Sequence, residues 1–175
     1  MMVDDLKVEA FTVKEEREIV ALIRRNLESF DKAESVLVAT FRRLENLDHF
    51  YQGEGCRLFV AKNMALGGQA IACAGLGPLH GLPLSEGIGE IRDLVVEEDC
   101  RGKGLGSRLL RRCIEEAKSL GYQRLYLETS KNMVNARKLF LRSGFRPVTE
   151  SSPLVKLPAD LPCYFLMEDL QHRKN

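Results

Sequence analysis

The spacing of apolar positions changes several times along the chain, and each change predicts a new strand or helix. Weak alternation over residues 6–11 predicts a first strand. Thr12, followed three residues later by Glu15, has the spacing of a helix capping box, and apolar residues at helical spacing follow it. Asp31 is the expected cap of a second helix, whose apolar face extends to Leu47. The N-terminal part is therefore predicted as one strand and two helices.

The middle of the chain has the pattern of two paired strands followed by a central strand. Residues 56–61 and 69–75 are short apolar runs, so we predict a hairpin with its turn at residues 63–68. Residues 77–89 are rich in glycine and proline without a regular period, which predicts a mobile loop. This loop leads into residues 90–96, whose apolar and β-branched residues predict a buried strand.

The remaining segments alternate between the apolar spacing of helices and that of strands. The expected elements are a helix over residues 104–120, a strand over 124–128, a helix over 132–142 and strands over 145–148 and 163–167. Prolines break the segment between the last two strands. Because strands precede, interleave with and follow helices, we predict an α/β fold with a mixed sheet.

Composition narrows the class of protein. The chain has 175 residues, enough for one packed domain, which we place over residues 1–175. Its formal net charge of +1 argues against nucleic acid or an anionic membrane as a partner. The five cysteines are scattered without a C-x-x-C pair, so we expect reduced thiols in a cytoplasmic protein. The histidines lie far apart and predict no metal site, and neither a signal peptide nor a membrane span is expected.

A glycine-rich stretch lies between the predicted central strand and the helix that follows it. Glycine at such a turn lets a ligand approach the main chain, and the free N–H groups of a helix N-terminus attract an anion. The spacing fits neither a G-x-G-x-x-G dinucleotide fingerprint nor a P-loop. We therefore predict a pyrophosphate cradle, with an ordinary strand–helix turn as the alternative. The expected contacts are Arg101, Gly102, Lys103, Gly104, Leu105, Gly106 and Ser107.

Three motifs in this region resemble those of one enzyme family. Arg101, Gly104 and Gly106 match a signature of the GNAT N-acetyltransferases, in which glutamine or arginine is separated by two residues from Gly-x-Gly or Gly-x-Ala. Residues 90–96 resemble the family's central strand, and residues 136–145 resemble its A-x-x-L-Y-x-x-x-G-F helix and turn. The three motifs occur in the family's order and spacing. On these motifs the chain resembles the GNAT N-acetyltransferases.

This resemblance implies a fold and a cofactor. The fold is a mixed, mostly antiparallel sheet of about seven strands flanked by helices, with a splay between the fourth and fifth strands that admits the cofactor. The resemblance also implies acetyl-CoA as the acyl donor and an amine as the acceptor. The family binds the pantetheine, and can face the thioester oxygen, with central-strand main chain, here Leu94, Val95 and Val96. Asn132 and Phe140 are further expected cofactor contacts.

Transfer to an amine needs a base, because alkylamines are mostly protonated at neutral pH. Glu90 is the expected catalytic base, since many family members carry glutamate at this position; Asp93 is the first alternative and Glu128 the second. A surface Glu90 paired with Arg92 is the competing interpretation. Strict alternation would place Asp93 on the opposite face from Glu90 and Arg92. Leu94 would then share the face of Glu90.

The chain departs from the family pattern at the position of the general acid. The resemblance places the family's acidic tyrosine at position 140, which here is Phe140. Phenylalanine has no proton to give, so Tyr126, Tyr164 or water would protonate the thiolate, or it leaves unassisted. Alternatively, Phe140 is an apolar helix residue that packs beside Leu139.

The function implied is acetyl-CoA-dependent N-acetylation of a small metabolite or amino-acid-like amine. One alternative is an acyl-CoA-binding regulatory module with little turnover, suggested by the missing tyrosine. Another is acetylation of a protein lysine or N-terminus, which would need an open peptide groove. The expected partners are acetyl-CoA and a small amine, with no nucleic acid and no membrane; a homodimer is left open.

Overall fold

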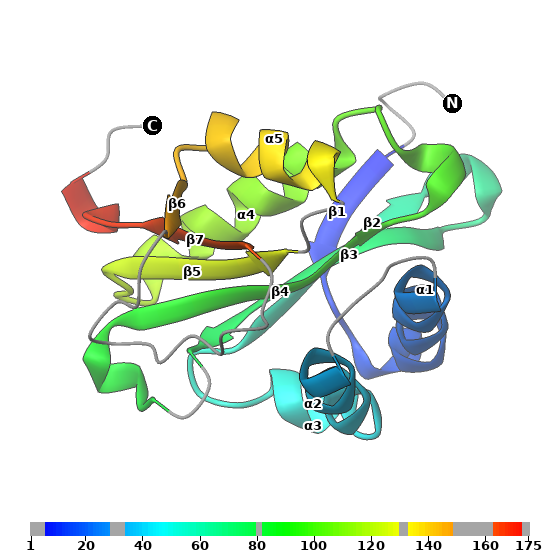
Figure 1. Cartoon of the computed structure of the whole chain (residues 1–175). Helices are drawn as coiled ribbons and strands as arrows, with labels where there is room; N and C mark the ends of the chain where they lie inside the picture. The colour runs from blue at the N-terminus through cyan, green and yellow to red at the C-terminus, as the bar shows by residue number, and fades with distance from the viewer. Residues whose placement is uncertain (1–5, 29–33, 80–81, 130–132, 149–162, 173–175) are drawn as a thin grey trace.

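The described residues form a sheet with helices on both faces (Figure 1). The computed structural model describes residues 6–28, 34–79, 82–129, 133–148 and 163–172. The strands are β1 (Leu6–Ala10), β2 (Arg57–Asn63), β3 (Gln69–Pro78), β4 (Ile88–Val96), β5 (Arg124–Thr129), β6 (Arg146–Val148) and β7 (Cys163–Met167). They lie in the order β1-β2-β3-β4-β5-β7-β6. Among these described strands only β4 and β5 pair in parallel, which confirms the mixed, mostly antiparallel α/β sheet.

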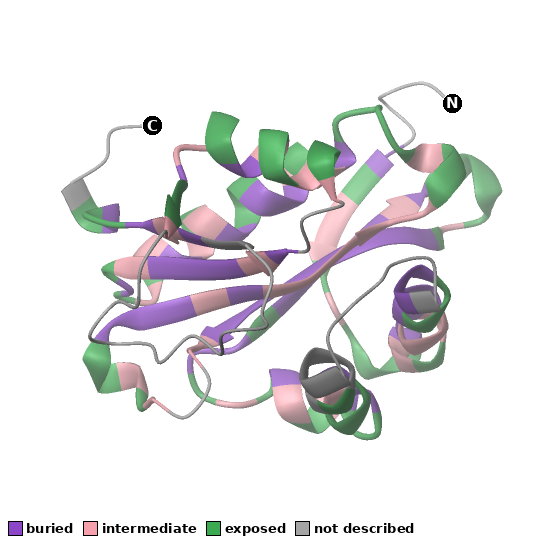
Figure 2. Cartoon of the chain, viewed as in Figure 1, coloured by how far each residue is buried: buried purple, intermediate pink, exposed green. Residues whose placement is uncertain are grey.

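The helices divide between the two faces of this sheet. On one face lie α1 (Glu16–Glu28), α2 (Glu34–Leu44) and α3 (Leu47–Tyr51), and on the other α4 (Leu105–Ser119) and α5 (Val134–Arg142) (Figure 1). Each face has its own apolar cluster. Figure 2 shows buried residues concentrated in the sheet and on the helix faces turned toward it. The central strands are covered on both sides, which explains why they read as nearly continuous apolar runs.

The two central parallel strands separate along their length. Pairing of β4 with β5 runs from Ile88 opposite Arg124 to Ile91 opposite Leu127. Beyond that point β4 continues to Val96, but its partner along this edge is no longer β5. The expected splay between the fourth and fifth strands is therefore present, and the last residues of β4 lie beside it.

A bulge interrupts the pairing of β3 with β4 at the same level. Cys73 pairs with Val95 and Gly75 with Arg92, so a single β3 residue faces two residues of β4. The first of these is Asp93, which has a φ of 52°, in the left-handed region that non-glycine residues rarely occupy. A bulge of this kind adds one residue and shifts the alternation of side chains.

The predicted alternation along the central strand is therefore wrong. Arg92 and Asp93 both lie on the face covered by α2 and α3, where they contact residues of those helices. Leu94 instead packs against the cluster of the opposite face, away from Glu90 and Arg92. The extra residue of the bulge, which no periodicity in the sequence reveals, causes this reversal.

Several predicted boundaries also shift. The predicted second helix is broken into α2 and α3 at Asn46, whose backbone is not helical and whose carbonyl accepts the Phe50 N–H. Residues 77–89 are not wholly a loop, because β3 continues to Pro78 and β4 begins at Ile88. The capping interaction is confirmed: the Thr12 N–H donates to the Glu15 carboxylate at 2.8 Å. Asp31 lies outside the described residues.

Candidate active site

The glycine-rich turn between β4 and α4 is the candidate anion-binding loop. Gly102 and Gly104 have φ values of 76° and 80°, which glycine adopts without steric cost. Gly104 directly precedes α4, so the unpaired N–H groups of the helix N-terminus lie at this turn. A Cβ atom built on either glycine would meet no atom within 4 Å. Open space therefore lies beside the predicted cradle, as a bound pyrophosphate would need.

Basic side chains of the turn hold its shape. Arg101 donates through Nε to the Val96 carbonyl at 3.1 Å and through Nη2 to the Asn26 side chain of α1 at 2.9 Å. Lys103 donates to the Asp99 carbonyl at 2.7 Å. Both side chains thus have protein partners, while their positive charges stay beside the glycine turn, where they favour an anion.

The first turn of α4 lies close to α5. A Cβ on Gly106 would lie 3.3 Å from Leu139 Cδ2, so a larger residue would push the two helices apart. Leu105 is 1% exposed and belongs to the core, so the cradle can use only its main chain. Ser107 is exposed on the first turn. The loop, α4 and α5 therefore meet beside the end of β4.

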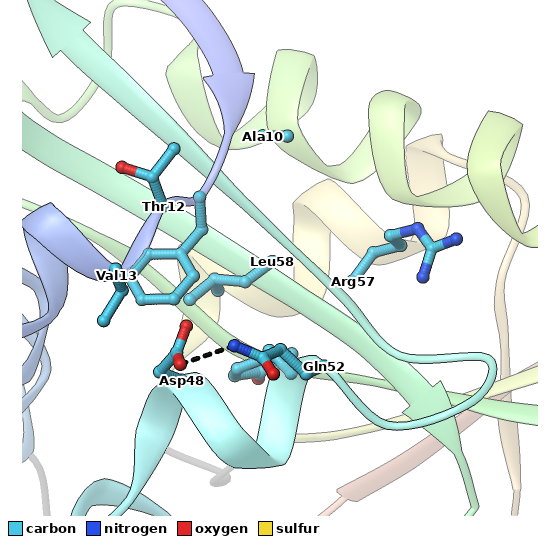
Figure 3. A pocket seen from close by; sticks show the side chains of 9 residues that line it. Ala10, Thr12, Val13, Asp48, Gln52, Arg57 and Leu58 are labelled. Carbon is cyan, nitrogen blue, oxygen red and sulfur yellow. Dashed lines mark hydrogen bonds between the residues drawn. The ribbon is translucent and has the colours of Figure 1, made fainter.

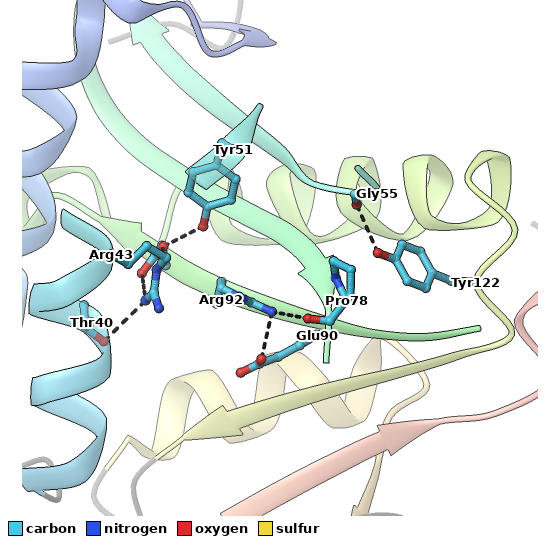
Figure 4. Close-up of polar contacts among 9 residues, drawn as sticks. Thr40, Arg43, Tyr51, Gly55, Pro78, Glu90, Arg92 and Tyr122 are labelled. Carbon is cyan, nitrogen blue, oxygen red and sulfur yellow. Dashed lines mark hydrogen bonds and ion pairs between the residues drawn. The ribbon is translucent and has the colours of Figure 1, made fainter. Parts of the chain in front are cut away.

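Glu90 stands where β4 and β5 begin to separate. It pairs with Tyr126 of β5, one residue before the pairing ends, and its side chain is 21% exposed. Arg92 Nη2 lies 2.9 Å from Glu90 Oε2 and also donates to the Pro78 carbonyl at 2.6 Å (Figure 4). The Arg92 guanidinium stacks 5.2 Å from the centre of the Phe50 ring. An arginine fixed by three contacts thus orients a carboxylate that solvent can still reach.

Asp93 has a different environment from Glu90. Its side chain is 2% exposed. Arg43 of α2 binds both carboxylate oxygens, at 2.8 Å through Nε and 2.6 Å through Nη2. Tyr51 of α3 donates its hydroxyl to Oδ2 at 2.5 Å, and Figure 4 shows Arg43 and Tyr51 converging on this point from the two helices. No sequence pattern links Arg43 or Tyr51 to Asp93, since each lies more than forty residues away from it along the chain.

These contacts decide which groups carry charge. Burial alone would raise the pKa of Asp93, but the charge and hydrogen bonds of Arg43, with the Tyr51 hydrogen bond, hold it below its ordinary value. Burial and the neighbouring Asp93 raise the pKa of Tyr51 well above its usual range. Asp93 is therefore ionised and Tyr51 protonated at neutral pH.

Some of the other candidate site residues lie in the core, one lies where β5 has separated from β4, and others lie outside the described residues. Phe140 is 5% exposed, and its ring packs edge-on against Phe145 and Phe165, at centroid distances of 6.3 and 5.6 Å. Tyr126 is also buried. Glu128 is partly buried on β5, beyond the residues that pair with β4. Asn132 lies outside the described residues, as does the side chain of Tyr164.

A separate pocket of about 300 Å³ opens near the turn from β1 to α1 (Figure 3). Its lining residues are Ala10, Phe11, Thr12, Val13, Asp48, Tyr51, Gln52, Arg57 and Leu58. None of them is a site residue predicted from the sequence, although Tyr51 also belongs to the Asp93 cluster. The pocket therefore borders the Asp93 cluster through Tyr51 and includes none of the predicted site residues.

In the described segments, no group of three or more histidine, cysteine, aspartate or glutamate side chains is placed to hold a metal ion. None of the helices in those segments is long and apolar enough to cross a membrane. Cys56, Cys73, Cys100 and Cys113 are free thiols.

Known proteins resemble this chain in sequence and in fold. It is 35% identical to the uncharacterized N-acetyltransferase YobR of Bacillus subtilis over 41% of this chain and 29% of that protein. It is 39% identical to the aminoalkylphosphonate N-acetyltransferase of Salmonella typhimurium over 34% of this chain and 38% of that one. It is 34% identical to the probable glucosamine 6-phosphate N-acetyltransferase 2 of Oryza sativa over 33% of each. The chain thus matches less than two thirds of the length of these relatives.

Solved structures share the whole architecture. A GNAT-family acetyltransferase from Staphylococcus aureus superposes with a TM-score of 0.74 at 18% identity, covering 93% of this chain and 98% of that one. The structure of yncA from Salmonella typhimurium, which carries its cofactor acetyl-CoA, gives 0.74 at 17% identity over 98% and 97%. The sequence profile of the Acetyltransferase (GNAT) family matches residues 9–145. The chain belongs to the Acetyltransferase (GNAT) family.

Proposed function

We propose that the chain transfers the acetyl group of acetyl-CoA to the amino group of a small metabolite or amino-acid-like acceptor. Three features support acetyl-CoA as the donor. The glycine turn before α4 offers main-chain N–H groups and open space to a pyrophosphate. The separation of β4 from β5 makes room for an extended pantetheine beside Val95 and Val96. A protein of the same fold carries acetyl-CoA as its cofactor.

A small acceptor is supported by chemistry near Glu90 and by the names of relatives. The face that carries Glu90 also carries the cations of Arg92 and Arg43, grouped around Phe50. Arg43 is paired with Asp93 and Arg92 with Glu90, so the charges of this cluster balance and the face suits a small polar amine. Two relatives are named for aminoalkylphosphonate and glucosamine 6-phosphate, and both compounds are amines with an anionic group.

The observation that carries the proposal is the position of Glu90. A partly exposed carboxylate at the point where the two strands part can take the proton of an incoming ammonium group, directly or through a water. The freed nitrogen lone pair then forms a C–N bond with the acetyl carbonyl carbon. The C–S bond breaks, the attacking nitrogen releases its second proton to water, and the products are the N-acetyl amine and the CoA thiolate. Because Phe140 has no hydroxyl, water is the proposed proton source for that thiolate.

The test combines an amine screen with one isosteric substitution. The parent is incubated with acetyl-CoA and a broad set of small amines, and released thiol is measured from neutral to alkaline pH. Glu90→Gln keeps shape and a hydrogen bond but cannot take a proton, so we expect a loss of roughly 10²-fold at neutral pH with acetyl-CoA affinity nearly unchanged. The loss should shrink as pH approaches the pKa of the acceptor amine.

Glu115→Gln is the matched control, because the Glu115 side chain is 42% exposed on α4 and pairs with Arg111 one turn earlier in the same helix. Its rate should equal that of the parent. Equal rates for Glu90→Gln and the parent at every pH would remove Glu90 as the base and leave Asp93 or Glu128.

A second candidate function rests on Phe140. The chain lacks the hydroxyl that the family resemblance assigns to the general acid, which favours an acyl-CoA-binding module with little turnover. The same screen decides between the two functions. A parent that binds acetyl-CoA but releases no thiol with any amine would support the binding module.

A further inference from the structure

The bulge in β4 combines strained backbone with a buried charge. Asp93 adopts a φ of 52°, a conformation unfavourable for a residue other than glycine, and its carboxylate is 2% exposed. Strain of this kind persists only where surrounding contacts fix the backbone. The contacts that hold Asp93 in this conformation are therefore candidates for a functional role.

Three side chains from different elements fix this residue. Arg43 of α2 and Tyr51 of α3 together give the Asp93 carboxylate three hydrogen bonds, at 2.8, 2.6 and 2.5 Å. The Cys73 thiol of β3 donates to the Asp93 carbonyl at 3.3 Å. We refer to Arg43, Tyr51, Cys73 and Asp93 as the bulge clamp. It ties both the side chain and the main chain of one residue to α2, α3 and β3.

The neighbouring strand is shaped to admit this arrangement. A Cβ on Gly75 would lie 1.9 Å from the Tyr51 hydroxyl oxygen and 2.5 Å from Cζ. No side chain larger than hydrogen can occupy that position while Tyr51 reaches Asp93. Gly75 is also the residue at which the register of β3 and β4 shifts. The bulge, the glycine and the tyrosine thus form one interlocked unit.

This unit lies at the edge of the gap between β4 and β5. Strand pairing ends at Ile91, and Asp93 follows two residues later. The main chain after it, at Leu94–Val96, is the segment along which the pantetheine and the thioester would lie in the proposed function. The direction in which its N–H groups point depends on the conformation of the bulge.

We propose that the bulge clamp is a positioning device, which holds the main chain of β4 in the orientation that the acetyl thioester requires. This inference rests on the proposed function. Asp93 then acts through the backbone of β4, and Glu90 remains the residue that exchanges protons. A displacement of about 1 Å at a reacting group can cost on the order of 10²-fold in rate, so fixing the bulge has a direct kinetic consequence.

The surroundings of Asp93 favour positioning over proton transfer. Both carboxylate oxygens already accept from Arg43, and Oδ2 also accepts from Tyr51. With 2% exposure, little room remains for an acceptor amine. Glu90, on the same strand face, is 21% exposed and has Arg92 as its ion-pair partner.

The experiment compares graded variants of the clamp. Tyr51→Phe removes one hydrogen bond, Arg43→Lys keeps the charge but loses the two-point contact, and Arg43→Met removes both. We expect kcat to fall in this order, by up to about 10- to 100-fold, while the KM for acetyl-CoA changes only a few-fold. From neutral to alkaline pH the loss should stay constant, unlike that of Glu90→Gln.

Ile23→Val is the control for stability alone. Ile23 of α1 is 1% exposed in the same apolar cluster as Tyr51, and its apolar side chain can form no hydrogen bond or ion pair with the clamp. It should lower the melting temperature while leaving kcat unchanged. The two variants are compared by the loss of kcat for each degree by which the melting temperature falls. If this ratio is the same for Ile23→Val and Tyr51→Phe, the clamp only stabilises the fold. If the loss in the clamp variants vanishes at alkaline pH, Asp93 is the base.

Hydrogen exchange provides a readout that needs no turnover. In Tyr51→Phe and Arg43→Lys, backbone amides of residues 88–96 should exchange faster, while those of β7 should not. Unchanged exchange across β4 would overturn the clamp even if the enzyme is active. Faster exchange in a protein without turnover would support a clamp on the bulge while refuting the proposed function.

Discussion

At the scale of single residues, two carboxylates three residues apart differ in their exposure to solvent and in their hydrogen bonds. Glu90 is 21% exposed and pairs with Arg92 alone among the described ion pairs. Asp93 is 2% exposed and accepts three hydrogen bonds. Environments that differ in this way assign different roles to the same functional group. We assign proton exchange to Glu90 and backbone positioning to Asp93.

Phe140→Tyr tests whether position 140 faces the CoA sulfur. If it does, as the family resemblance implies, the new hydroxyl can protonate the departing thiolate, and we expect turnover to rise with a melting temperature close to that of the parent. Turnover and thermal melting are measured on the same preparation. A variant that melts earlier and turns over no faster would show that the Phe140 ring points only into the core.

Phe145→Tyr is the matched control for this substitution. Phe145 packs edge-on against Phe140 and is 2% exposed, so a hydroxyl added there is buried without a partner. An unsatisfied buried hydroxyl costs about 1–3 kcal/mol. We expect this control to lose stability without any gain in rate.

Sequence reasoning at this scale found the residues of β4 and missed those that act on them. Glu90 and Asp93 were recognisable because they belong to one contiguous motif. Arg43 and Tyr51 reach Asp93 from other elements, and nothing in their own segments marks them as polar partners of a strand. The face of Asp93 was predicted wrongly, since a one-residue bulge reverses the alternation without changing composition.

At the scale of elements, the turn from β4 into α4 is the feature that the sequence predicted most fully. Its glycines, its position after an apolar strand and the helical spacing that follows are all local signals. By contrast, the break between α2 and α3 depends on the backbone at Asn46, and the lengths of β3 and β4 depend on their pairing with each other. Elements fixed by local sequence were predictable, whereas boundaries fixed by tertiary pairing were not.

Gly104→Glu tests the cradle at the N-terminus of α4. A carboxylate there would occupy the open space beside the turn and repel a pyrophosphate, so we expect no detectable CoA binding by titration calorimetry in a protein that remains folded. Gly121→Glu is the control at the other end of the helix. Gly121 has a φ of 85°, close to the 80° of Gly104, and its added Cβ also meets open space.

The two variants therefore carry similar backbone strain but different proximity to the cradle. The control should retain the CoA affinity of the parent while losing comparable stability. Should Gly104→Glu bind CoA as tightly as Gly121→Glu does, the pyrophosphate lies elsewhere and the cradle assignment is wrong.

At the scale of the whole molecule, the bulge clamp joins helices of one face to the strand that borders the gap. Helices α4 and α5 cover the opposite face and provide the proposed cradle, whereas α2 and α3 send Arg43 and Tyr51 to β4 (Figures 1 and 4). The central strands thus lie between a face proposed for the cofactor phosphates and a face proposed for positioning. Removing the clamp should change the stability of the fold as well as its chemistry.

The pH dependence of the free energy of unfolding shows whether the buried Asp93 carboxylate is paired with a cation. In the parent, the pKa of Asp93 is lowered on folding, so its stabilising contribution is present above its unfolded pKa of about 3.9 and is lost as pH falls through the folded value. In Arg43→Met the buried carboxylate lacks its cation, and burial then raises its folded pKa. A raised pKa reverses the sign: the penalty is largest at neutral pH and disappears as Asp93 becomes protonated in acid.

We therefore expect Arg43→Met to be less stable than the parent by about 3–5 kcal/mol at neutral pH, with the difference narrowing toward pH 4. Chemical denaturation of both proteins at several pH values measures this directly. Arg111→Met serves as the control, because Arg111 is 72% exposed and its pair with Glu115 spans only one helical turn, where such pairs contribute a few tenths of a kcal/mol. A difference for Arg43→Met that stays constant with pH, or widens in acid, would mean that Asp93 is not held as an ion by Arg43.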